Sequence, residues 1–186
     1  MIVILAGVSG SGKTTVGQLL ADRLGWPFAD GDTFHTPASV AKMRAGIPLT
    51  DDDRWPWLAA VRAWIDERIA AGGSGVVACS ALKRRYRDFL LDGRPDVRLV
   101  FLDLTRDEGL ARLRARHGHF FPARLLDSQF ADTEPPGPDE RALVVAARQS
   151  PDELVEQIIS GLGLAGVAAQ RPAPDLIAPG ERPAEI

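Results

Sequence analysis

Short apolar runs alternate along the chain with longer stretches in which apolar residues recur at helical spacing. The short runs predict strands at residues 2–6, 26–29, 76–79, 97–103 and 141–146. The longer stretches predict helices at residues 13–24, 37–44, 55–71, 81–91, 105–116 and 151–162. Strands that alternate with helices of about ten residues or more form parallel sheets covered by helices on both faces. We therefore expect one three-layer α/β domain, over residues 1–165, built around five parallel strands.

Two segments fall outside this alternation. Residues 117–139 form a long connection with four prolines between a predicted helix and a predicted strand, which is typical of an active-site lid. Residues 166–186 contain four prolines, five alanines and few side chains that could pack against a core. We expect this second segment to be a flexible C-terminal tail.

The composition excludes several classes of protein. The 186 residues carry a formal net charge of −3, whereas proteins that bind nucleic acid through its phosphates are usually basic. Cys79 is the single cysteine, so an internal disulfide and a cysteine-rich zinc site are both impossible. No apolar run approaches the roughly 20 residues of a membrane span, and the apolar start lacks a basic segment before it. We expect a cytoplasmic protein that binds neither nucleic acid nor a membrane.

A glycine-rich motif joins the first predicted strand to the first predicted helix. Residues 7–14 read GVSGSGKT, which matches the phosphate-binding pattern G-x-x-x-x-G-K-[ST] at every fixed position. The glycines let backbone N–H groups turn toward a phosphate chain, and the helix adds the positive end of its dipole. Lys13 would contact the β- and γ-phosphates, and the hydroxyl of Thr14 suits Mg²⁺. The motif predicts a P-loop fold with a nucleotide site formed by Gly7, Ser9, Gly10, Ser11, Gly12, Lys13, Thr14 and Thr15.

Such a loop serves kinases, GTPases and motor ATPases alike, so the reaction has to be inferred from other residues. The N-K-x-D motif of GTPases is absent, and the chain is short for a motor ATPase. Asp30 and Asp32 follow the second predicted strand, and residues two apart in extended chain point the same way. One carboxylate could hold Mg²⁺ through water, and the other could accept the proton of an attacking hydroxyl. A polar β-turn is the structural alternative.

Two pairs of cations have the spacing of one helix face. Lys83 and Arg87 could grip an anionic substrate, with Ser80 capping their helix, or they could form a solvated basic face. Arg112 and Arg116 could close over the phosphates of a nucleotide, or they could be a surface pair. These residues alone leave both alternatives open.

Polar residues nearer the two aspartates have equally ordinary explanations. His35 could be a helix-entry or surface histidine, and Lys42 fits a solvated helix face. The acidic residues 51–53 could cap a helix that starts near Pro56, because carboxylates are favoured at helix N-termini. Their assignment therefore depends on the wider pattern of motifs.

Taken together, several motifs resemble the small P-loop gluconate kinases of the thermoresistant type, which are related to shikimate and adenylate kinases. The matching stretches are GVSGSGKTT at 7–15, DGDTFH at 30–35, KM at 42–43, GIPLTDDDRWPWL at 46–58, ACSALKRRYRD at 78–88, RLRARHGHF at 112–120, LLDSQF at 125–130 and EPP at 134–136. The phosphate loop is common to many enzymes, whereas the ordered set is specific and covers roughly residues 2–162.

This resemblance implies transfer of the γ-phosphoryl group of ATP to the 6-hydroxyl of D-gluconate, with Mg²⁺ as the ion and a homodimer as the assembly. The residues it makes catalytic are Lys13, Asp32 and Arg116. Asp32 would orient the acceptor hydroxyl, while Thr14 and Asp30 would support Mg²⁺. Arg112 and Arg116 would clamp the phosphates of ATP. The residues it implies as contacts of the sugar acid are Asp32, His35, Lys42, Asp53, Arg54, Ser80, Lys83, Arg87, His119 and Gln129.

The chain departs from the family pattern at four positions. Thr36 and Ser39 stand where relatives commonly have proline and asparagine, and Asp132 and Thr133 stand in place of a small polar residue and leucine. Two alternatives are another small-molecule kinase of this fold, such as a shikimate kinase, and a nucleotide-binding regulatory protein without turnover. Shikimate kinases have a G-G-G loop where this chain has CSALK. We also expect the 117–139 lid to close when both substrates bind.

Overall fold

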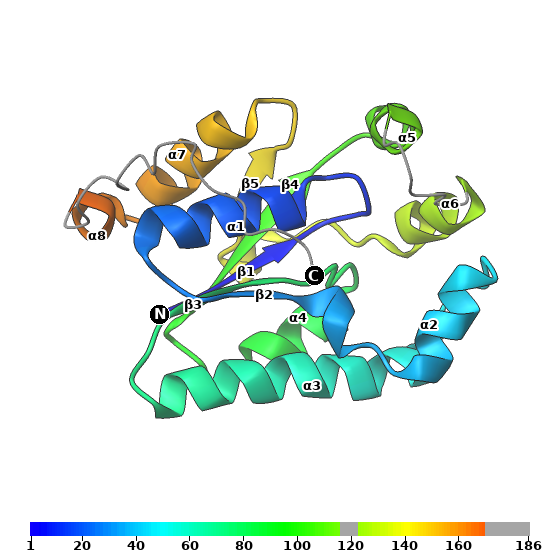
Figure 1. Ribbon diagram of the computed structural model, residues 1–186, viewed down its shortest axis with the longest axis horizontal. Coiled ribbons are helices and arrows are strands. Elements are labelled where there is room, and N and C mark those ends of the chain that lie inside the picture. The colour runs from blue at the N-terminus through cyan, green and yellow to red at the C-terminus, as the bar shows by residue number, and fades with distance from the viewer. Residues whose placement is uncertain (116–122, 170–186) are drawn as a thin grey trace, which may run out of the picture.

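The computed structural model describes residues 1–115 and 123–169. Five strands form one sheet in the order β2-β3-β1-β4-β5, which confirms the expected α/β class (Figure 1). The strands are β1 (Ile2–Ala6), β2 (Phe28–Asp30), β3 (Gly75–Ala78), β4 (Val97–Asp103) and β5 (Leu143–Ala146). Every neighbouring pair is parallel, so all five strands end at the same edge of the sheet.

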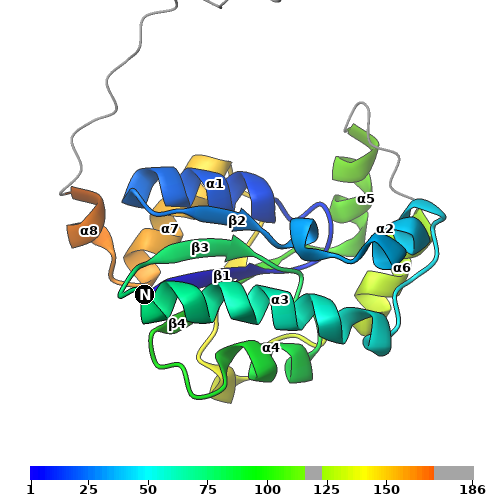
Figure 2. The ribbon, with the colours of Figure 1, turned by 60° about the horizontal axis from the view of Figure 1, so that its bottom comes forward.

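Helices cover both faces of the sheet and also gather beside the carboxyl ends of the strands (Figure 1, Figure 2). One face carries α1 (Lys13–Leu24) and α7 (Pro151–Gly161), with α8 (Ala165–Ala169) packed against both. The other face carries α3 (Asp51–Ala70) and α4 (Arg84–Leu91). The helices beside the strand ends are α2 (Pro37–Arg44), α5 (Arg106–Ala115) and α6 (Ala123–Asp132).

The central strand shows why the sheet needs helices on both sides. Along β1, Val3 and Leu5 belong to the core beneath α1 and α7, whereas Ile2 and Ile4 belong to the core against α3 and α4. All four side chains are fully buried. A strand buried on both faces reads as an unbroken apolar run instead of an alternation, and this is the pattern from which β1 was predicted.

Helix α3 begins four residues before the predicted start at residue 55. The hydroxyl of Thr50 accepts a hydrogen bond from the backbone N–H of Asp53, and the Asp53 carboxylate accepts one from the N–H of Thr50. This reciprocal capping box satisfies two N–H groups that the first turn of a helix leaves free. Pro56 consequently lies inside the helix and not at its beginning.

Helix α4 begins three residues after the predicted start at residue 81. Ala81 has a φ of 38°, in the left-handed region, so the chain makes a turn here before the helix begins. Lys83 takes the N-cap position without a side-chain capping bond. The prediction that Ser80 caps this helix is therefore wrong.

The two segments outside the alternation contain regular structure. The predicted lid, 117–139, includes α6 and the short 3-10 helix η2 (Pro138–Glu140), while residues 117–122 lie outside the described residues. Residues 166–169, which we assigned to the tail, belong to α8, and 170–186 lie outside the described residues. Within the described ranges, no helix is long and apolar enough to cross a membrane.

Candidate active site

The phosphate loop lies between β1 and α1, at the carboxyl edge of the sheet. Gly7 has a φ of 132°, and a Cβ on it would lie 2.6 Å from the carbonyl oxygen of Leu102, so only glycine fits this turn. The N–H of Gly7 donates to the carbonyl oxygen of Ser80, at 3.1 Å, and the Nζ of Lys13 donates to the carbonyl oxygen of Val8, at 3.0 Å. The loop is therefore fastened to the turn that follows β3.

Two oxygen ligands meet beside this loop. The hydroxyl of Thr14 donates to the carboxylate of Asp30 at 2.9 Å, so the start of α1 and the end of β2 present oxygen atoms to one point. Mg²⁺ prefers oxygen ligands and commonly combines one or two protein groups with phosphates and water. Among the described residues, no group of three or more His, Cys, Asp or Glu could hold a metal. The pair fits a magnesium ion that also binds a phosphate chain, and does not form a complete protein cage.

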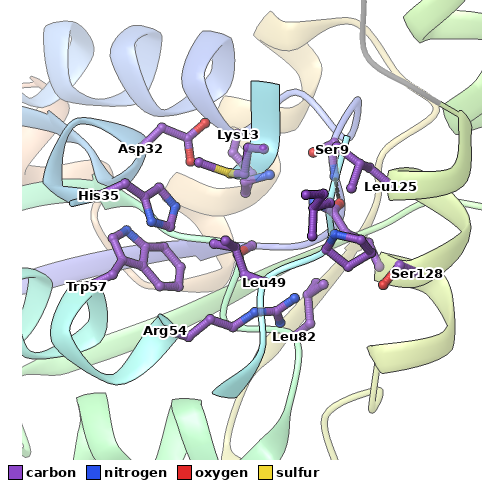
Figure 3. A pocket seen from close by; sticks show the side chains of 15 residues that line it. Ser9, Lys13, Asp32, His35, Leu49, Arg54, Trp57, Leu82, Leu125 and Ser128 are labelled. Atoms are coloured by element: carbon purple, nitrogen blue, oxygen red, sulfur yellow. Dashed lines mark hydrogen bonds between the residues drawn. The ribbon is translucent and has the colours of Figure 1, made fainter. Parts of the chain in front are cut away.

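A cavity of about 100 Å³ opens beside the loop, below the ends of β1, β2 and β3. Its polar lining residues are Ser9, Lys13, Asp32, His35, Arg54, Ser80, Ser128 and Gln129. Its apolar lining residues are Met43, Ile47, Pro48, Leu49, Trp57, Leu82 and Leu125. In Figure 3, Asp32, His35 and Trp57 face Ser9 and Ser128 across the opening. The cavity thus offers both charges and hydrogen-bonding groups to a small polar molecule, over an apolar wall.

Asp32 reaches this cavity from a 3-10 turn and not from extended chain. The residues after β2 form η1 (Gly31–Phe34), and the carboxylate of Asp30 accepts from the N–H of Asp32 at 3.0 Å. Asp30 therefore caps the turn and faces Thr14, whereas Asp32 lines the cavity. The argument that two residues in extended chain point the same way was wrong, because the chain turns at Gly31.

His35 and Trp57 form the wall beside Asp32. Their rings stack with centroids 4.6 Å apart, and the indole N–H of Trp57 donates to the carbonyl oxygen of Gly31 at 2.7 Å. Burial lowers the pKa of His35, although the nearby Asp32 carboxylate acts in the opposite direction. The Nδ1 of His35 is buried and has no hydrogen-bond partner among the described residues. A neutral imidazole with an unused nitrogen suits a hydrogen bond to a substrate hydroxyl.

Arg54, which lines the cavity, belongs to a network of charges. The guanidinium of Arg54 lies 3.2 Å from one carboxylate oxygen of Asp132, and the Nζ of Lys83 lies 3.1 Å from the other. Lys83 also lies 3.1 Å from the carboxylate of Asp51, which in turn pairs with Arg85. The network joins the first turn of α3, the first turn of α4 and the last residue of α6.

Comparison with known proteins shows the family to which this chain belongs. The shikimate kinase family model matches residues 9–162. The gluconokinase of Gluconobacter oxydans is 48% identical over 157 residues, which cover 84% of this chain and 88% of that protein. The thermoresistant gluconokinase of Escherichia coli is 40% identical over 152 residues, which cover 82% of this chain and 87% of that protein. This chain belongs to the gluconokinase family.

Solved structures agree with this membership. A gluconokinase from Sinorhizobium meliloti superposes with a TM-score of 0.78 at 44% identity, over 87% of this chain and 91% of that one. A sugar kinase from Janibacter reaches 0.84 at 46% identity, over 91% and 98%. A shikimate kinase from Acinetobacter baumannii, solved with shikimate, reaches 0.57 at 18% identity over 88% and 93%, which supports the fold alone. The family resemblance inferred from the motifs is confirmed.

Two of the predicted sugar-acid contacts in this gluconokinase are paired with each other. The Nζ of Lys42 donates to both carboxylate oxygens of Asp53, at 2.6 and 2.8 Å. Hydrogen bonds from Lys42 and Thr50 lower the pKa of Asp53 to about 2. Asp53 is thus a capping residue of α3 that also fixes α2, and neither side chain lines the cavity. The alternative explanation of the acidic run as a helix cap holds for this residue.

Arg87, which was predicted to grip the substrate together with Lys83, points into the protein interior and does not line the cavity. Its side chain is fully buried, and its guanidinium is bound by both carboxylate oxygens of Glu140 at 2.6 and 2.9 Å. It also donates to the carbonyl oxygens of Ala81, at 3.3 Å, and Leu82, at 2.8 Å. Arg87 therefore holds the turn that carries Ser80 and Leu82, and it does not line the cavity.

Arg112, predicted to clamp the phosphates of ATP, lies against the phosphate loop. Its guanidinium donates to the carbonyl oxygens of Gly10 and Ser11, at 3.3 and 3.4 Å, and to that of Ala147. A second cavity, of about 320 Å³, lies beside it between the loop, α5 and the start of α7. Arg116 and His119 lie outside the described residues.

The sequence reasoning missed Ser128, which lines the cavity one residue before the predicted contact Gln129. The side-chain oxygen of Gln129 accepts from the N–H of Ser9 at 2.7 Å, so α6 is tied to the phosphate loop. We treated this part of the chain as an irregular lid because of its prolines. The spacing of Leu125, Leu126 and Phe130 is helical and was the available signal for α6.

Proposed function

We propose that this gluconokinase transfers the γ-phosphoryl group of ATP to the 6-hydroxyl of D-gluconate and releases 6-phospho-D-gluconate and ADP. The observation that carries the proposal is the cavity in which Lys13 of the phosphate loop, Asp32 and Arg54 face one space. The gluconokinases that resemble this chain over most of its length support the choice of substrate. We favour gluconate over shikimate because the two gluconokinases compared above are 48% and 40% identical to this chain, whereas the shikimate kinase is 18% identical.

On the donor side, the phosphate loop would receive the triphosphate between the two cavities. The backbone N–H groups of the loop and the first turn of α1 would bind the phosphates, with Lys13 adding its charge. The second cavity, which Arg112 and Gln149 help to line, would accept the rest of the nucleotide. Thr14 and Asp30 would hold Mg²⁺, which neutralises charge on the β- and γ-phosphates when bound.

On the acceptor side, each part of gluconate meets a suitable group. The Asp32 carboxylate would orient the 6-hydroxyl toward the γ-phosphate and accept its proton. His35, Ser80 and Gln129 would bond the other hydroxyls, since all three line the cavity and carry hydrogen-bonding atoms. Arg54 would bind the carboxylate end, because a guanidinium matches a carboxylate with two N–H groups. The apolar wall would exclude water from the γ-phosphate, which limits wasteful hydrolysis of ATP.

Three further features belong to the proposal. The enzyme would act in the cytoplasm and would be a homodimer, and its residues 117–139 would close over the bound substrates. Light scattering of the purified protein would measure the dimer, for which a monomer at all concentrations is the contrary result. Protection of 117–139 from protease by nucleotide plus gluconate would support the closure, and equal cleavage with and without both ligands would contradict it.

The test of the reaction is Asp32→Asn, with Asp92→Asn as the control. Asp92 is an exposed residue at the end of α4, remote from both cavities. Loss of a general base costs about 10²–10⁴-fold in rate, so Asp32→Asn should lose that much kcat with gluconate while its affinity for ATP changes little. Asp92→Asn should behave as the wild type does.

The same coupled assay separates the alternatives. The wild type is given gluconate, related sugar acids and shikimate, each with ATP and Mg²⁺. Turnover on shikimate alone would make the chain a shikimate kinase. Binding of ATP with no turnover on any acid would favour the regulatory protein. Full activity of Asp32→Asn on gluconate would support the proposed reaction but would contradict the role of Asp32 as its general base.

A further inference from the structure

Asp132, the last residue of α6, forms ion pairs with Arg54 and Lys83, and Arg54 lines the cavity beside the phosphate loop. One of its oxygens lies 3.2 Å from the guanidinium of Arg54, and the other lies 3.1 Å from the ammonium of Lys83. All three side chains are largely shielded, with exposed fractions of 27% for Asp132, 11% for Arg54 and 18% for Lys83. A single acidic group thus holds two cations that belong to different helices.

The charges around this point do not balance. Three cations, Arg54, Lys83 and Arg85, meet two carboxylates, those of Asp51 and Asp132. Arg54 is the one of these three cations that lines the cavity, so an anion that enters the cavity meets Arg54. Asp51 is already shared by Lys83 and Arg85. Among the residues that the structure describes, Asp132 is the one acid paired with Arg54.

We propose that Asp132 is an internal counter-ion of Arg54 that weakens the binding of an acidic substrate and so sets the affinity of the acceptor site. This inference rests on the proposed function, because it takes the carboxylate of a sugar acid to be the incoming anion. Asp132 does not touch the reacting atoms. It acts through Arg54, and is therefore a positioning residue.

The physical reason is competition for one guanidinium. Arg54 has five N–H donors and can contact two carboxylates, but two like charges on one arginine repel each other. The repulsion is felt strongly here, because the three side chains are mostly shielded from water. A sugar acid must therefore either displace Asp132 from Arg54 or bind beside it. Both routes raise the KM for the acid, and neither affects the binding of ATP at the other side of the phosphate loop.

An alternative role for Asp132 is to fasten α6, which lines the cavity through Leu125, Ser128 and Gln129. The two roles predict opposite changes on removing the charge. If Asp132 only fastens the helix, its loss loosens the cavity wall, and the KM for gluconate rises. If it is a counter-ion, its loss frees Arg54, and the KM for gluconate falls.

The experiment compares Asp132→Asn with Asp127→Asn in steady-state assays on the full chain. Asp127 lies on the same helix and pairs with the exposed Arg106, at 2.7 Å, away from the cavity. Asp132→Asn should lower the KM for gluconate by about 5–30-fold, as expected for removing a like charge beside a bound anion, with the KM for ATP unchanged. Asp127→Asn should leave both KM values as they are. A third variant, Asp132→Glu, keeps the negative charge and should keep the higher KM.

Salt provides a second readout. Without Asp132 the site carries more positive charge, so added salt should raise the KM of Asp132→Asn for gluconate more steeply than that of the wild type. An unchanged or raised KM for gluconate in Asp132→Asn would overturn the inference while leaving the proposed function intact. A wild type that phosphorylates no sugar acid would overturn both.

Discussion

The buried ion pair between Arg87 and Glu140 makes a quantitative prediction about stability. The pair joins α4 to η2, across 53 residues of sequence, with exposed side-chain fractions of 0% for Arg87 and 3% for Glu140. Glu140→Gln keeps the shape and hydrogen-bonding oxygen of the side chain, including the oxygen that accepts from the N–H of Gly137 at 2.9 Å. The substitution removes the negative charge and replaces one of the two oxygens that bind Arg87 with an amide NH2, which cannot accept a hydrogen bond.

The expected cost follows from what Glu140→Gln leaves behind. Arg87 stays charged and buried, and its remaining acceptors are the carbonyl oxygens of Ala81 and Leu82 and the one amide oxygen of the new glutamine, none of which carries a charge. Removing one partner of a buried pair costs about 3–5 kcal/mol, because the other charge is left without compensation. That is a large share of the roughly 5–15 kcal/mol by which domains are stable. For a chain of this size it corresponds to a fall in Tm of about 6–20 °C.

Urea unfolding followed by circular dichroism measures this cost. The matched control is Asp139→Asn, since Asp139 pairs with Arg84 across the same two elements but both side chains are exposed, at 61% and 49%. Exposed pairs contribute little, so this control should leave the unfolding midpoint almost unchanged. A shift for Glu140→Gln no larger than that of Asp139→Asn would refute the reasoning from burial.

Acid gives an independent check on the same pair. Arg87 lowers the pKa of Glu140 below its ordinary value of 4.5. Its contribution to stability is therefore complete above about pH 4.5 and is lost as the pH falls through the lower pKa of the folded state. The gap in unfolding free energy between wild type and Glu140→Gln should narrow in that acidic range. A gap that stays constant down to the pH of acid unfolding would show that charge is not its origin.

Two further predictions concern the turn after β2 and the cysteine after β3. A Cβ at Gly31 would lie 2.2 Å from the carbonyl oxygen of Ala78, so Gly31→Ala should lower the unfolding midpoint and reduce kcat. The control is Gly166→Ala, which should change neither, because a Cβ there has nothing within 4 Å. A Gly31→Ala variant with an unchanged midpoint and kcat would contradict the close packing. Burial raises the pKa of Cys79 to about 12 from its ordinary 9.0, so a thiol reagent at pH 8 should label the native protein about 10³-fold more slowly than the unfolded chain, and rapid native labelling would contradict this burial.

The sequence was sufficient for the fold wherever a local pattern determined the structure. The β1 run and the helix after the phosphate loop have the predicted bounds, because burial on both faces and the glycine turn are written in consecutive residues. The start of α3 was missed although Thr50 and Asp53 have capping-box spacing, since the helix was expected to start near Pro56. The start of α4 depends on the positive φ of Ala81, which Arg87 stabilises from further along the chain.

The site was predictable as a set of residues but not as a set of partners. Asp32 and Arg54, two of the predicted contacts of the sugar acid, line the cavity and belong to specific motifs next to strand and helix ends. The burial of Arg87 could not be predicted, because its partner Glu140 lies 53 residues away and only folding brings them together. The ion pair of Lys42 with Asp53 could not be predicted for the same reason, since it forms between two helices.

The hydrogen bond from the N–H of Gly7 to the carbonyl oxygen of Ser80 joins the phosphate loop to the turn after β3. This part of the active site has less freedom to change in evolution than the opposite wall of the cavity. Ser80, with Lys13 and Asp32, is anchored to strand ends whose spacing the sheet determines. The opposite wall consists of side chains on helices, such as Arg54 of α3 and Ser128 of α6, and these side chains can be substituted without moving those strands. New substrate preferences should therefore arise by substitutions of the cavity-lining side chains of α2, α3 and α6, while the phosphate loop stays unchanged.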